Sequence, residues 1–235
     1  MLVMEFEIVK QVVESKPRTA VKPREFFIAW SGVSTLAYQG FTRPLLGIKR
    51  ELEQKIPGIK PENPGSKWPK TTLGALRDDR QLSWVDLNIL RDICNNLNQQ
   101  IDGSKIILPI HQLEVVIFQC RSLEKRLITY PIELNSKEYD EEVNGQHKEN
   151  DVDKVMDQFH ETRLAGYWSD VSRPGNRESH YRMLHIESTL IYDLPPPKNQ
   201  PTYIDTFIEE VEKRLPGLYC WFAPESRHMT VRALS

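Results

Sequence analysis

The sequence predicts an α+β fold in which two pseudo-symmetric lobes of antiparallel sheet carry helices on their outside and have a cleft between them. Three pairs of similar segments, which occur in the same order, support this prediction. They are residues 34–38 (Ser-Thr-Leu-Ala-Tyr) and 188–192 (Ser-Thr-Leu-Ile-Tyr), 53–58 (Glu-Gln-Lys-Ile-Pro-Gly) and 212–217 (Glu-Lys-Arg-Leu-Pro-Gly), and 70–76 and 228–234. The spacing from the glycine to the third segment is twelve residues in one copy and eleven in the other. We therefore expect one bilobal domain over residues 1–235, with repeats at 24–79 and 178–235.

Each repeat has the pattern strand, helix, Pro-Gly stop, strand. Aromatic and branched residues at 26–30 and 34–38 are typical of strands. Pro44 suits the first turn of a helix, whose end Pro57-Gly58 marks. In the second repeat we expect strands at 183–192, 218–222 and 228 onward, and a helix at 203–215.

The segments outside the repeats are predicted from the same signals. The middle of the chain, residues 80–177, begins with a helix that Ser83 caps, followed by strand candidates. Residues 133–161 hold ten acidic residues against three lysines. We expect 133–150 to form a mobile acidic loop and the residues after it a short amphipathic helix. The expected strands are at 106–120 and 126–134, the short helix is at 152–164, and a peripheral strand or arm is at 6–13.

The composition argues against several classes of protein. A net charge of −2 over 235 residues provides no general attraction for a DNA duplex. Three widely spaced cysteines and six histidines have no metal-ligand spacing, so no metal or cofactor is expected. No apolar run approaches the roughly 18–20 residues that span a bilayer, and no signal peptide is recognisable. We expect a soluble cytoplasmic protein without a membrane partner; its oligomeric state is not predicted.

The last strand of each repeat carries the candidate chemistry. In the run His228-Met229-Thr230-Val231, strand alternation places His228 and Thr230 on one face. An imidazole beside a hydroxyl on a rigid strand is suited to holding and turning over a phosphate. The first repeat has Thr72 at the position of Thr230, and Lys70 at the position of His228.

This layout resembles the two-histidine phosphoesterase superfamily, which includes the RNA ligase-like 2′,3′-cyclic phosphodiesterases. The segment 222–231 is similar to the family's lead into one His-x-Thr motif, and residues 61–73 resemble the other motif in altered form. The resemblance covers about residues 25–79 and 178–234. It implies a cyclic-phosphate nucleotide or RNA end as the substrate, with one histidine as base, the other as acid, and two hydroxyls that hold the phosphoryl oxygens. By position it makes His228, Thr230 and Thr72 the catalytic residues.

Lys70 departs from the family's pattern. A lysine with the usual pKa of about 10.4 stays charged at pH 7, so it neutralises a phosphate but is a poor general base. Trp68, two residues earlier, is a candidate for stacking on a base, and His185 for the same cleft as His228. We group Lys70, Trp68 and His185 as predicted substrate-binding residues; His180 and Tyr181 are further candidates.

Three hypotheses are compatible with the sequence. The first is a divergent phosphodiesterase that acts through His228 and Thr230 with Lys70 and Thr72 opposite. The second is a catalytically impaired protein of the same fold that binds a nucleotide or phosphate. The third is an interaction protein without an active site, in which the acidic segment 133–161 contacts a partner.

Overall fold

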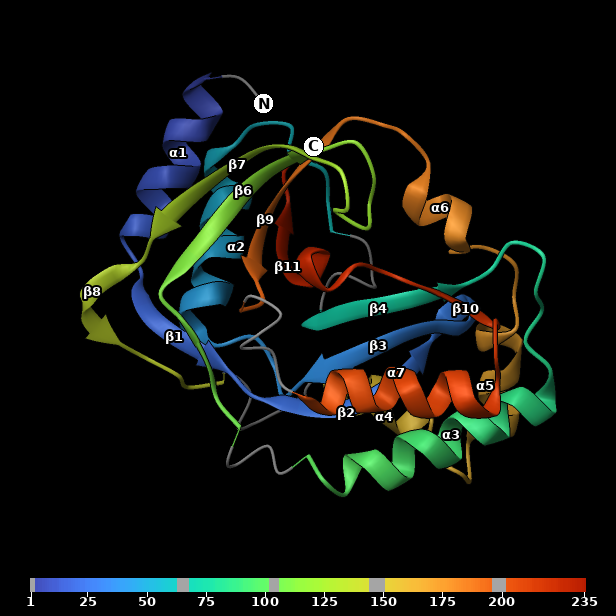
Figure 1. Cartoon of the computed structure of the whole chain (residues 1–235). Coiled ribbons are helices and arrows are strands. Elements are labelled where there is room, and N and C mark those ends of the chain that lie inside the picture. Colours follow the sequence, from blue (N-terminus) through green and yellow to red (C-terminus); the bar gives the residue numbers. More distant parts are fainter. Residues whose placement is uncertain (1–2, 63–67, 102–105, 144–150, 196–201) are drawn as a thin grey trace.

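The computed structural model describes residues 3–62, 68–101, 106–143, 151–195 and 202–235 (Figure 1). The predicted α+β class, with two lobes of antiparallel sheet, is confirmed. The main sheet has eight strands, and all of its pairings are antiparallel. Its order is β2 (Pro23–Ala29), β3 (Val33–Tyr38), β4 (Lys70–Leu76), β11 (His228–Ala233), β9 (Glu187–Asp193), β6 (Gln112–Phe118) and β7 (Arg126–Glu133), with β10 (Tyr219–Trp221) paired to β4.

The two halves of this sheet have matching topology. In the first half, β3 leads through α2 (Arg43–Lys55) to its antiparallel neighbour β4. In the second half, β9 leads through α7 (Thr202–Arg214) to its antiparallel neighbour β11. Gly58 and Gly217 follow these helices with φ of 83° and 66°, a left-handed conformation that glycine adopts without strain.

The halves are also interleaved, because the helix of each contacts a strand of the other. Lys49 of α2 donates a hydrogen bond to the carbonyl of Val231 on β11 at 3.1 Å. Phe207 of α7 stacks on Phe26 of β2, with ring centroids 4.2 Å apart. Figure 1 shows α7 in front of β2 and β3, and α2 behind β6 and β9. One continuous hydrophobic core therefore joins both halves.

A helix and a second, three-stranded sheet beside the first correct two predictions. Residues 6–13 form part of helix α1 (Val3–Glu14), because Val9, Val12 and Val13 recur at helical spacing and are all buried. Within the predicted acidic loop 133–150, residues of β8 (Asn135–Tyr139) pair with β1 (Pro17–Val21), which also pairs with β5 (Leu108–Ile110). Residues 144–150 of that predicted loop lie outside the described residues.

The middle of the chain supplies the remaining helices. Ser83 caps α3 (Trp84–Asn98) as predicted, in a reciprocal capping box with Asp86. The predicted helix at 152–164 is instead two helices, α4 (Asp151–Gln158) and α5 (Leu164–Val171). The strand predicted from residue 183 begins at Glu187 and follows the short helix α6 (Glu178–Arg182). None of the described helices combines the length and apolar character needed to cross a membrane.

Candidate functional site

The site is built where the two halves of the sheet meet, at β4 and β11. Met229 lies opposite Thr71 in this antiparallel pairing. Counting outward from that pair places Lys70 next to Thr230, and Thr72 next to His228. Both strands start with the same burial pattern: the first and third residues are partly exposed, and the second and fourth are buried. All four predicted side chains therefore share one face of the sheet.

A cleft with a volume of about 380 Å³ covers this face. Five of the six predicted site residues line it, namely Trp68, Lys70, Thr72, His228 and Thr230. Arg121, Tyr181 and Ser188 contribute further polar groups to its walls. The cleft therefore combines cations, hydroxyls and an imidazole, groups that can bind an anionic ester, with the carboxylate of Glu187, which lies beside Arg121.

His228 is held in one tautomer by the turn that precedes it. Its Nδ1 lies 2.7 Å from the carbonyl oxygen of Ser226. Because a carbonyl oxygen only accepts, Nδ1 carries the hydrogen and Nε2 retains its lone pair. Burial lowers the pKa of His228 to about 4; nearby Arg126 lowers it further, whereas the Ser226 hydrogen bond and Asp193 oppose the shift. At neutral pH the imidazole is therefore an uncharged proton acceptor.

The environment of Lys70 lowers its pKa as well. Burial is the main cause, the ammonium of Lys49 adds to it, and Glu62 opposes it, so that the pKa of Lys70 falls to about 8. Lys49 is itself buried, and it donates to Glu62 at 2.7 Å. A lysine with a pKa near 8 remains mostly charged at pH 7 and gives up its proton far more readily than an ordinary one.

Hydroxyl groups complete the cleft beside these two residues. Tyr181 hydrogen-bonds to Thr72, and burial raises the pKa of Tyr181 to about 12, so its phenol stays protonated at neutral pH. Ser188 is 5% exposed and lines the cleft, and among the described residues its Oγ has no hydrogen-bond partner. A buried hydroxyl without a partner gains a hydrogen bond when a ligand enters.

Arg121 lies at the rim of the cleft, in contact with His185. Its Nε donates to Nε2 of His185 at 3.3 Å, and its Nη1 lies 2.9 Å from Nε2 of His180. Its Nη2 is 3.5 Å from a carboxylate oxygen of Glu187. His185 is not among the residues that line the cleft; it lies behind them, in contact with the lining residues Arg121, Phe118 and Glu187. These contacts fix the guanidinium where a phosphate could enter.

Trp68 packs more tightly than the stacking prediction implies. The side chain is 7% exposed, and its ring meets Phe27 edge to face at a centroid separation of 5.9 Å. The ammonium of Lys70 lies 4.2 Å from its ring centroid. Trp68 thus forms part of the wall behind Lys70, and the structure offers little free ring surface for a base.

The cleft residues differ in how visible they are in the sequence. Ser188 belongs to a repeated segment, so the repetition could have marked it as a candidate site residue. Arg121 sits in an irregular turn after β6, and no periodicity or motif marks it. Among the described residues, no group of three or more histidines, cysteines or carboxylates is arranged to hold a metal ion.

Comparison of the chain with protein-family models, with curated proteins and with solved structures finds no match.

Proposed function

We propose that the chain is a divergent phosphodiesterase, similar to the two-histidine phosphoesterases, that opens the 2′,3′-cyclic phosphate of a nucleotide or RNA end. The observation that carries this proposal is the pairing of β4 and β11 at Thr71 and Met229. In that register, Lys70 and Thr72 of β4 lie on the same face as His228 and Thr230 of β11, and all four line one cleft.

The proposed reaction divides two proton transfers between the halves. Nε2 of His228 accepts a proton from a water molecule, whose oxygen attacks the phosphorus. The bond between phosphorus and one ribose oxygen breaks, and the ammonium of Lys70 gives that oxygen a proton. The product is a nucleoside 2′- or 3′-monophosphate. The proton held by His228 returns to Lys70 through solvent, so the enzyme is restored.

The pKa values give both groups the protonation states that these roles require. With a pKa of about 4, His228 is neutral at pH 7 and ready to accept a proton. With a pKa of about 8, Lys70 is mostly protonated at pH 7 and able to donate. A bound phosphate raises both values, because its negative charge favours the protonated forms of both groups. This makes His228 a stronger base in the complex than in the free protein.

The remaining polar groups fit the binding of phosphoryl oxygens. Thr72 and Thr230 stand beside the reacting groups, and Ser188 offers a hydroxyl that has no hydrogen-bond partner among the described residues. Arg121 adds a guanidinium, which binds two oxygens at once and counters charge that builds up during the reaction.

A second candidate is a nucleotide-binding protein of the same fold that does not turn its ligand over. The low pKa of His228 favours it, since an imidazole with a pKa of about 4 is a weak base. Lys70 and Arg121 keep the affinity for phosphate in either case.

Purified protein incubated with the four 2′,3′-cyclic nucleotides, with chromatographic detection of monophosphates, separates the two candidates. Turnover supports the phosphodiesterase if the His228→Ala variant loses it and the His111→Ala variant keeps it. His111 is the control because it is exposed and lies outside the cleft. Calorimetric binding without turnover supports the second candidate. If the protein neither binds the cyclic nucleotides nor turns them over, both candidates are contradicted.

A further inference from the structure

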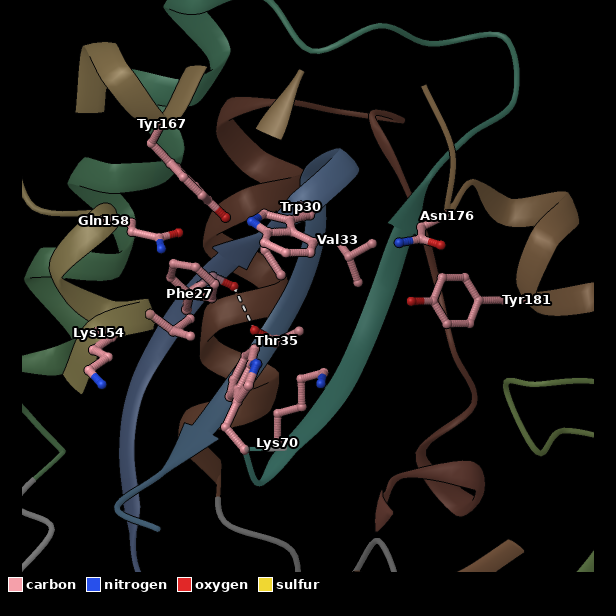
Figure 2. A pocket seen from close by; sticks show the side chains of 13 residues that line it. Phe27, Trp30, Val33, Thr35, Lys70, Lys154, Gln158, Tyr167, Asn176 and Tyr181 are labelled. Atoms are coloured by element: carbon pink, nitrogen blue, oxygen red, sulfur yellow. Dashed lines mark hydrogen bonds between the residues drawn. The ribbon is translucent and has the colours of Figure 1, made fainter. Parts of the chain in front are cut away.

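A second hollow adjoins the cleft on the first half of the sheet (Figure 2). Its volume is about 330 Å³, and it lies between β2 and β3 on one side and the α4–α5 segment on the other. Lys70, Trp68 and Tyr181 line both this hollow and the cleft. We call it the side pocket. A ligand with its phosphate beside Lys70 is therefore at the entrance of a separate compartment.

The walls of the side pocket are mainly flat and apolar. Phe27, Trp30 and Tyr167 supply aromatic rings, and Val33 and Val155 supply aliphatic groups. Polar side chains stand among them: Figure 2 shows Gln158 on the side of α4, and Asn176 and Tyr181 on the opposite side. Apolar walls with a few separated polar groups are typical of pockets that take a small molecule in one orientation.

Several contacts hold these walls in place without a ligand. The hydroxyl of Tyr167 donates to the carbonyl of Ile28 at 3.1 Å and ties α5 to β2. The hydroxyl of Thr35 donates to the carbonyl of Phe27 at 2.9 Å, drawn as a dashed line in Figure 2. The pocket is thus preorganised, which lowers the entropic cost of binding.

Trp30 is positioned by its own backbone turn. It is 37% exposed, and the guanidinium of Arg173 lies 4.4 Å from its ring centroid. The next residue, Ser31, is buried with φ of 61°, a left-handed conformation that is uncommon outside glycine. Strain of this kind at a non-glycine residue is often found at ligand-binding sites.

We propose that the side pocket binds the heterocyclic base of a nucleotide whose phosphate occupies the cleft. This inference rests on the proposed function. It restricts the substrates to cyclic phosphates whose ribose carries a base and excludes sugar phosphates without one. Trp30 presents the exposed ring of the pocket, on which a planar base can stack, and Gln158 and Asn176 are amides that both donate and accept, as the edge of a base requires. An alkyl chain would make no use of those amides.

The test compares a ligand that has a base with one that lacks it. Calorimetry measures the affinities of adenosine 2′,3′-cyclic phosphate and of ribose 2,3-cyclic phosphate for the wild type, for Trp30→Ala and for Trp84→Ala. Trp84 is a matched control, since it is 43% exposed and lines neither hollow. We expect Trp30→Ala to weaken nucleotide binding about tenfold or more, to leave binding of the sugar phosphate unchanged, and Trp84→Ala to change neither.

The outcomes separate this inference from the proposed function. Equal affinity of the wild type for both ligands, or an unchanged affinity in Trp30→Ala, overturns the base pocket while the phosphate site stands. Failure of both ligands to bind the wild type overturns the proposed function and with it the inference. If Trp30→Ala does not fold, Gln158→Leu serves in its place, with a loss of at least threefold expected for the nucleotide alone and no loss contradicting the inference.

Discussion

β4 and β11 occupy equivalent places in the fold, yet they carry different chemistry. Both begin with two partly exposed polar residues separated by a buried one, and the buried residues Thr71 and Met229 face each other across the join. β11 presents an imidazole and β4 presents an ammonium. Burial acts on both groups in the same direction, because it disfavours the charged form of each.

Burial of an imidazole on one strand and of an ammonium on the other lets one cleft separate two tasks. The same lowering of pKa makes His228 a neutral group and leaves Lys70 a cation that can still release a proton near neutrality. In this interpretation β11 contributes the base, and β4 contributes the charge that binds phosphate together with the acid. Replacing residues at matched positions of the two strands tests that division.

Removing the imidazole should have the largest effect. We expect His228→Asn to lower kcat about 10²- to 10⁴-fold, since general-base catalysis contributes on that scale, while the calorimetric Kd for inorganic phosphate stays within about threefold. A parallel loss of phosphate affinity would show that β11 also provides binding, contrary to the proposed division.

Removing the ammonium should affect binding and stability in opposite directions. We expect Lys70→Met to weaken phosphate binding about tenfold or more, and to raise the free energy of unfolding at pH 7 by about 1–3 kcal/mol, because a buried charge is lost. In the wild type, stability should rise between about pH 8 and 10.5, where the folded state has released the proton that the unfolded state keeps.

Urea unfolding of the wild type and of Lys70→Met at pH 7 and pH 10 measures this effect. The exposed Lys213→Met is the control and should change neither quantity. A destabilised Lys70→Met protein would contradict an unfavourable buried charge.

A third asymmetry lies further along the two strands. Gly74 on β4 corresponds to Arg232 on β11. At this position β4 pairs with β10, where Trp221 lies opposite Gly74. A Cβ on Gly74 would lie 2.8 Å from the carbonyl oxygen of Cys220. We expect Gly74→Ala to reduce the free energy of unfolding by about 1–3 kcal/mol. In helix α5, the Cβ of Gly166→Ala meets no atom of the described part of the chain within 4 Å, so this substitution should be neutral or stabilising. Equal stability of the two variants in urea unfolding would contradict the close approach of β10.

The smallest effects should come from the hydroxyls. Thr72→Val and Thr230→Val each remove one hydrogen bond to a phosphoryl oxygen, which corresponds to about a five- to tenfold increase in KM. The exposed Thr206→Val on α7 is the control and should leave KM unchanged. If only one of the two cleft variants has an effect, the phosphate is held by one strand alone.

The repeated segments explain why much of the fold could be predicted. The Ser-Thr-Leu segments became β3 and β9, and the Pro-Gly stops became the ends of α2 and α7. The alternation around Thr71 and Met229 also placed four of the site residues correctly on one face. These features depend on local periodicity and turn chemistry, which a sequence carries directly.

Other features depend on contacts between distant segments. Residues 6–13 are rich in branched side chains, which favoured a strand, and burial of Val9, Val12 and Val13 against the rest of the core selects the helical spacing that the segment also carries. The acidic composition of residues 133–150 concealed β8, whose partner β1 lies more than a hundred residues earlier. The side pocket forms because α4, α5 and α6 fold back over the sheet, and the position of Arg121 depends on its contact with His180 of α6. The family resemblance itself stays a prediction.

The most direct test is the pH dependence of kcat/KM for a 2′,3′-cyclic nucleotide, compared between the wild type and Lys70→His. The wild type should be flat from pH 5 to about 8, since His228 is already deprotonated, and should then fall about tenfold per pH unit as Lys70 loses its proton. In Lys70→His that fall should begin at or below about pH 6.5, the usual pKa of histidine. An identical profile in both proteins would contradict the claim that the two strands act together as base and acid.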